Sequence, residues 1–76
     1  MSFKLLDTVA VTADLPSHGL KRGDLGAVVQ VYSPKAVEVE FVTASGHTQA
    51  VVTLKTHQIR PVGSRDLLSV RQLDAA

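Results

Sequence analysis

The sequence predicts an all-β domain made of short strands, and three observations support this. Of its 76 residues, 45% are hydrophobic but only 4% are aromatic, so the core must consist chiefly of valine and leucine. The abundance of valine favours sheet over helix. Several segments alternate apolar and polar side chains with the period of two that marks a half-buried strand, and clusters of glycine, proline and serine separate these segments.

The first strand is expected over residues 7–12, where the alternation places Val9 and Val11 inward. A long loop is expected next, because Pro16 lacks a backbone donor and Gly19 permits a tight turn. This loop separates the first strand from the second.

Residues 20–31 organise the rest of the chain, because a turn with two glycines runs directly into a β-branched strand there. Gly23 and Gly26 lie where a chain that reverses into a strand often needs a positive φ or a close backbone approach. The second strand is therefore expected to begin near Leu25.

A hairpin is expected at residues 33–35, where Pro34 presets φ at the first corner of a reverse turn. The third strand, residues 36–42, has the cleanest alternation in the sequence. It places two valines and a phenylalanine on one face and Glu38 and Glu40 on the other, which specifies its register strongly.

The fourth strand is expected over residues 48–54, after a turn at 43–47, and pairs with the third strand in a meander. Residues 55–58 are too few for an α-helix and are expected to form one 3₁₀ turn. The fifth strand, residues 59–62, contains Pro61, which cannot donate to a ladder and therefore suggests an edge or closing strand.

Five short strands, a long first loop and a 3₁₀ turn before the last strand outline a small SH3-like barrel over residues 1–62. The side chains expected to face its single core include Val9, Val11, Val29, Val31, Val37, Val39, Phe41, Val52, Leu54 and Ile59. Residues 63–76, the tail, form a C-terminal extension. The tail is expected to be a short helix capped by Ser64, a strand, or partly disordered, since so short a helix is not stable alone.

Four segments carry a resemblance to known proteins: residues 5–9, 20–29, 37–41 and 54–62. They look like a family of short bacterial single-domain proteins of unknown function, over residues 5–62. This resemblance implies a fold and brings no activity. A shorter similarity, to the KOW motif of ribosomal and transcription-elongation proteins with SH3-like barrels, is carried by Gly23, Gly26, Val28 and Val31.

We expect no catalytic, cofactor or metal site. His18, His47 and His57 fall in three separate loops and lack the spacing of zinc ligands, so we expect solvated or turn-stabilising side chains. Glu38 and Glu40 share a strand face, and we expect an ordinary solvated sheet face there instead of an acid/base pair.

Charge and composition limit the classes of partner and the compartment that we expect. Eight basic and seven acidic residues give a net charge of +1, which is too balanced to imply nucleic-acid binding by itself. The chain has no cysteine, which suits a reducing cytoplasm. It has neither the apolar segment of a signal peptide nor an apolar run approaching about 18 residues, so a soluble cytoplasmic protein without membrane contact is expected.

Two classes of function remain. The favoured one is a non-catalytic binding module, an accessory or regulatory protein in bacteria. It engages another protein, or a second copy of itself, through an exposed strand edge or through the tail. The tail side chains expected at such a contact are Leu67, Leu68, Val70 and Leu73. The alternative is an RNA- or DNA-binding KOW-like domain with phosphate contacts from Lys21, Arg22 and Lys35.

Overall fold

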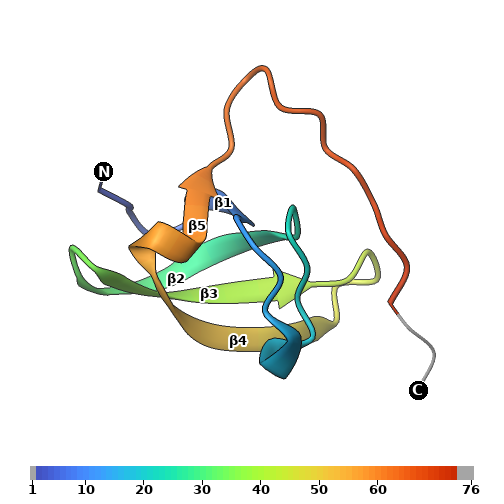
Figure 1. The fold of residues 1–76 in the computed structure, drawn as a ribbon, viewed down its shortest axis with the longest axis horizontal. Coiled ribbons are helices and arrows are strands. Elements are labelled where there is room, and N and C mark those ends of the chain that lie inside the picture. The colour runs from blue at the N-terminus through green and yellow to red at the C-terminus, as the bar shows by residue number, and fades with distance from the viewer. Residues whose placement is uncertain (1, 74–76) are drawn as a thin grey trace.

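The five strands of the chain form one antiparallel sheet in the computed structural model, which describes residues 2–73 (Figure 1). The strands are β1 (Thr8–Val11), β2 (Leu25–Ser33), β3 (Ala36–Val42), β4 (Thr48–Lys55) and β5 (Ile59–Pro61). Two 3₁₀ helices, η1 (Pro16–His18) and η2 (Thr56–Gln58), are the helical elements of the described residues. No helix in this part of the chain is long and apolar enough to cross a membrane. The all-β prediction is confirmed, as is the 3₁₀ turn before the last strand.

The sheet has the strand order β4-β3-β2-β1-β5. β1 pairs with both β2 and β5, so the last strand returns to the first, and β5 runs steeply across the direction of β3 and β4 in Figure 1. β4 and β5 lie at opposite edges of this order and do not pair with each other. The sheet is therefore open, and Pro61 lies on an edge strand as predicted.

The core lies on one face of β3, as the alternation of that strand predicts. Glu38 and Glu40 lie on the other face and are half-buried. The apolar side chains that form the buried core are Phe3, Val9, Val11, Leu20, Val28, Val37, Val39, Phe41, Leu54 and Ile59. Val52 is partly buried against them, so the core thins toward the β4 edge.

β2 differs from the prediction in which of its side chains face the core. Gly26 and Val28 are buried, Val29 is half-buried and Val31 is 40% exposed. The inward placement of Val29 and Val31 was wrong because Gly26, opposite Val9 of β1, sets the inward phase of the strand. The register of β2 against β3 then shifts twice, and such irregularities re-aim the side chains that follow them.

Leu20 completes the core from outside the strands. It forms an isolated bridge with Leu15, in which the Leu15 amide donates to the Leu20 carbonyl at 2.9 Å and the Leu20 amide returns a bond at 3.2 Å. The bridge closes the loop around η1. The long first loop is thus an ordered element that holds a core residue next to the start of β2.

The tail contains no helix over its described residues, 63–73. A turn closes where the Asp66 amide donates to the Gly63 carbonyl at 3.1 Å, and the chain then runs without regular structure. Leu67 and Val70 are 96% and 99% exposed, so no apolar face packs on the sheet, and a short helix lacks the packing that would stabilise it. In Figure 1 this segment arches away from β5 and returns beside the turn between β3 and β4. Residues 74–76 lie outside the described residues.

Gly26→Ala is expected to lower the free energy of unfolding by about 1–3 kcal/mol, which is typical of an overpacked core. A Cβ at this position would lie 2.5 Å from Cγ1 of Val39 and 3.0 Å from the backbone oxygen of Glu40, and neither atom is free to move away. Urea denaturation measures the change. The matched control is Gly63→Ala, whose new Cβ would make only an ordinary contact at 3.7 Å. Equal denaturation midpoints for the two variants would contradict the prediction.

Candidate functional site

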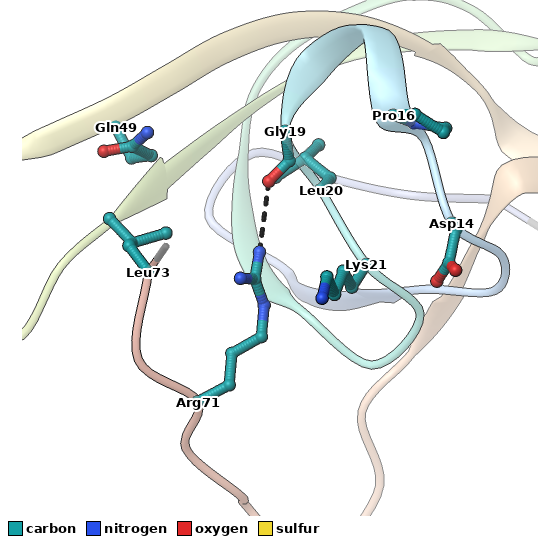
Figure 2. Close-up of a pocket in the computed structure, with 8 residues that line it drawn as sticks. All are labelled: Asp14, Pro16, Gly19, Leu20, Lys21, Gln49, Arg71 and Leu73. Carbon is teal, nitrogen blue, oxygen red and sulfur yellow. Dashed lines mark hydrogen bonds between the residues drawn. The ribbon is translucent and has the colours of Figure 1, made fainter. Parts of the chain in front are cut away.

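An ion pair between Arg71 and Asp24 fastens the tail to the sheet. The Arg71 Nε donates to Asp24 Oδ1 at 2.7 Å, and Nη2 donates to Asp24 Oδ2 at 2.7 Å. Arg71 Nη2 also donates to the Gly19 carbonyl at 3.1 Å (Figure 2). The two side chains are only 29% and 15% exposed. This fork geometry, which we call the clamp, is among the stronger charge-assisted contacts that proteins make.

The turn before β2 positions Asp24 without help from the tail. The Lys21 amide donates to Asp24 Oδ2 at 2.8 Å, and the Asp24 amide donates back to the Lys21 carbonyl at 2.9 Å. Gly23 has a φ of 93°, a conformation that glycine adopts without strain, and its amide donates to the Val11 carbonyl at 2.8 Å. The carboxylate is therefore held on β1 by its own turn.

The charges around Asp24 stabilise its ionised form. Hydrogen bonds from Arg71 lower the pKa of the Asp24 carboxyl below its ordinary value of 3.8; the Lys21 amide and the charges of Arg71 and Lys21 act in the same direction, while burial opposes them. A second, more exposed pair joins β5 to the start of the tail, where Arg60 donates to Asp66 at 2.9 and 3.0 Å. Those bonds lower the pKa of Asp66 and raise that of Arg60.

An open groove lies beneath the clamp. It consists of two hollows of about 690 and 570 Å³. Both are lined by Gly19, Leu20, Gln49, Arg71 and Leu73. Residues 19–25 form one wall, and residues 41–44 with Gln49 form the other. Residues 69–73 of the tail also belong to the lining.

The structure does not bring the predicted phosphate contacts together. Lys21 and Arg22 precede β2, whereas Lys35 lies in the turn that follows it, and nine strand residues span roughly 30 Å. Carboxylates also accompany the first two, because the Arg22 amide donates to Asp14 Oδ1 at 2.9 Å and the Lys21 amide donates to Asp24. The positive charge of this turn is therefore partly balanced in place.

The predicted apolar contacts of the tail separate into two groups. Leu67, Leu68 and Val70 are 96%, 69% and 99% exposed, whereas Leu73 is 40% exposed and lines the groove. Sequence reasoning missed the residue that anchors the segment, Arg71. Its partner Asp24 lies 47 positions earlier, and no local pattern links positions so far apart.

A second candidate surface is the free edge of β4. The Thr56 amide donates to the Lys35 carbonyl at 3.0 Å. Hydrogen-bonded pairs alternate along an antiparallel ladder, so counting from this bond along the β3–β4 register shows which groups face outward. Val51, Thr53 and Lys55 direct their backbone N–H and C=O groups away from β3. The Lys55 N–H donates to Gln58 Oε1 at 2.8 Å, so Val51 and Thr53 provide the outward N–H groups of this edge.

The two carboxylates on the outer face of the sheet accept hydrogen bonds from neighbouring hydroxyl groups. The Tyr32 hydroxyl donates to Glu38 Oε1 at 3.1 Å, and the Thr48 hydroxyl donates to Glu40 Oε2 at 2.7 Å. The bond to Glu38 raises the pKa of Tyr32. No group of three or more histidine, aspartate or glutamate side chains in the part of the chain that the structure describes could hold a metal ion.

One protein-family model matches the residues of the sheet. Residues 5–61 match the family described as "Domain of unknown function (DUF4926)". This range runs from just before β1 to the end of β5, so it includes Asp24 and excludes Arg71. No curated protein and no solved structure matches the chain.

Arg71→Ala is expected to lower the free energy of unfolding by about 1 kcal/mol, and Asp24→Ala by about 2 kcal/mol. The second change costs more because it also removes the acceptor of the Lys21 amide. Urea denaturation measures both. The control is Arg65→Ala, which removes an exposed arginine of the same tail, and we expect no measurable change. A cost for Arg65→Ala equal to that for Arg71→Ala would contradict the role of the clamp.

The clamp is expected to weaken in acid. Because the pKa of Asp24 is lowered on folding, its contribution to stability is complete above 3.8 and is lost as pH falls through the lower folded value. The difference in unfolding free energy between the wild-type chain and Arg71→Ala should therefore be constant near neutral pH and shrink below pH 3.8. Asp66 titrates in the same direction but is present in both proteins and cancels. A difference that grows in acid would contradict this assignment.

Proposed function

We propose that this chain, which belongs to the DUF4926 family of unknown function, is a non-catalytic protein-interaction module that pairs the free edge of β4 with an extended strand of a partner protein. Strand addition of this kind draws affinity from main-chain hydrogen bonds and specificity from alternate side chains. The outward backbone groups of Val51 and Thr53 carry the proposal.

The side chains of β4 also favour pairing. The strand has eight residues, and its one charge, Lys55, lies at its end. Natural edge strands are usually protected by central charges, proline or a short length, and β4 has none of these. Val51, on the outer face, is 48% exposed, and Val42 of the neighbouring strand β3 is 56% exposed. A partner strand would cover Val51 and the half-buried side of Val52.

The proposed fold class is a partly open SH3-like barrel. The strand order β4-β3-β2-β1-β5, with β1 paired to both β2 and β5, supports this class. So does the 3₁₀ turn η2, which directly precedes β5. A module of this size suits an accessory or regulatory subunit of a larger bacterial protein.

Val51→Pro tests the edge directly. Proline removes the outward N–H and places its ring where a partner strand would approach, yet it leaves the β3 ladder intact because that N–H does not face β3. The matched control, Val51→Ala, removes the same side chain but keeps the donor. Partner capture from an extract of the source cells, together with the molar mass in solution, should be kept by Val51→Ala and lost by Val51→Pro. Circular dichroism checks that each variant is folded.

Either of two results would overturn the proposal. One is a strictly monomeric wild-type chain that captures no partner. The other is a partner that binds Val51→Pro as tightly as the wild-type chain. If proline disturbs the fold, Val51→Lys provides the second variant, because a lysine on the exposed face of an edge strand blocks pairing at little cost in stability. If the partner is a second copy of this chain, the wild-type protein should be a dimer in solution, and Val51→Lys should dissociate it into monomers.

A further inference from the structure

We propose that the groove at Asp24 is a peptide-binding site for an extended segment of another protein that carries an arginine followed two positions later by an aliphatic side chain. In the structure the chain's own Arg71 occupies the acceptors at Asp24, and Gln72 and Leu73 belong to the lining of the groove, so the tail acts as an internal competitor. The inference concerns a different surface from the β4 edge and stands independently of it.

The acidic end of the groove is built to recognise a guanidinium group. Both oxygens of Asp24 accept from Arg71 at 2.7 Å, and the Gly19 carbonyl accepts a third bond at 3.1 Å. The Lys21 amide and the Gly23 bond to β1 hold this acceptor set in place, so a ligand would not have to organise it. A lysine cannot match this fork, because its ammonium is a point charge.

The other end of the groove is apolar. Leu20 and Phe41, each 3% exposed, belong to its lining, as do Leu73 and Gln49. Figure 2 shows Leu73 on the side of the groove where Gln49 lies. Leu73 is 40% exposed, against 96% for Leu67 in the same tail. Leu73, two positions after the arginine of the clamp, is therefore covered by the groove, whereas Leu67 remains exposed to solvent.

The internal ligand is held at few points. Between the Asp66 turn and the clamp, Leu67, Leu68 and Val70 remain exposed, and segments with few buried contacts open at low cost in free energy. The short connection to β5 gives the tail an effective concentration on the order of millimolar at the groove. A partner segment in free solution must therefore outcompete the tail, which raises the threshold for binding.

The remaining charges of the groove set its selectivity. Lys21, Arg22 and Asp14 also line it, and Asp14 lies beside Arg22, whose amide donates to its carboxylate. With Arg71 withdrawn, two carboxylates face two cations, so the site has no excess charge that would bind any basic peptide. Selectivity then depends on the fork geometry at Asp24.

The test uses the full chain and a fluorescent peptide with the sequence of residues 66–73, Asp-Leu-Leu-Ser-Val-Arg-Gln-Leu, in anisotropy titrations. Arg71→Ala vacates the site and should bind the peptide roughly tenfold more tightly than the wild-type chain does. Arg65→Ala, the matched tail control, should bind like wild type. Replacing the peptide arginine by lysine or glutamine, or adding Asp24→Asn to Arg71→Ala, should abolish this gain.

A second measurement does not depend on the folding of Arg71→Ala. The chain has no native cysteine, so Ser69→Cys takes a single spin label at a residue that lines the groove. The arginine peptide, on the order of 5 mM, should displace the tail and raise the mobility of the label, whereas the glutamine peptide should not. Equal binding of the arginine and glutamine peptides, or an unchanged label in both, would overturn the proposal.

Discussion

The close approach of β2 to β3 at Gly26 is the constraint on which the rest of the fold depends. A side-chain carbon at this position would run into Val39, Phe41 and the backbone of Glu40. With hydrogen in its place, β2 presses against the inner face of β3 and still pairs with β1 through Val9. This close approach lets the single layer of five strands bend around the core that it covers on one face.

Most of the strand pattern follows from local sequence, because regular alternation fixes which face is buried. β3 shows this best, since its residue bounds and inward face both agree with the prediction. β2 does not, because its run of adjacent valines fits either phase. The choice is made by the glycine opposite Val9 and by two register shifts, and these depend on neighbouring strands that no local window contains.

The candidate sites divide in the same way. The sequence predicts an exposed strand edge but not which strand provides it, because the strand order that leaves β4 at an edge depends on long-range pairing. The clamp could not be predicted, because the spacing of apolar residues in the tail suggests a helix, whereas the structure shows an ion pair between positions 47 residues apart. Asp24 reads as a turn residue in sequence and Arg71 as a surface charge. Only the fold brings them together, and it also separates Lys21 and Arg22 from Lys35.

The pairing of β1 with β5 has a consequence for how the protein is made. Val9 pairs with Pro61, so β1 receives its second neighbouring strand only when nearly the whole domain has left the ribosome. Long-range pairing of this kind slows folding, because the entropy of closing a large loop is lost before the contact forms. Nascent chains shorter than this length expose one side of β1, and during synthesis they are the species most open to chaperones or to aggregation.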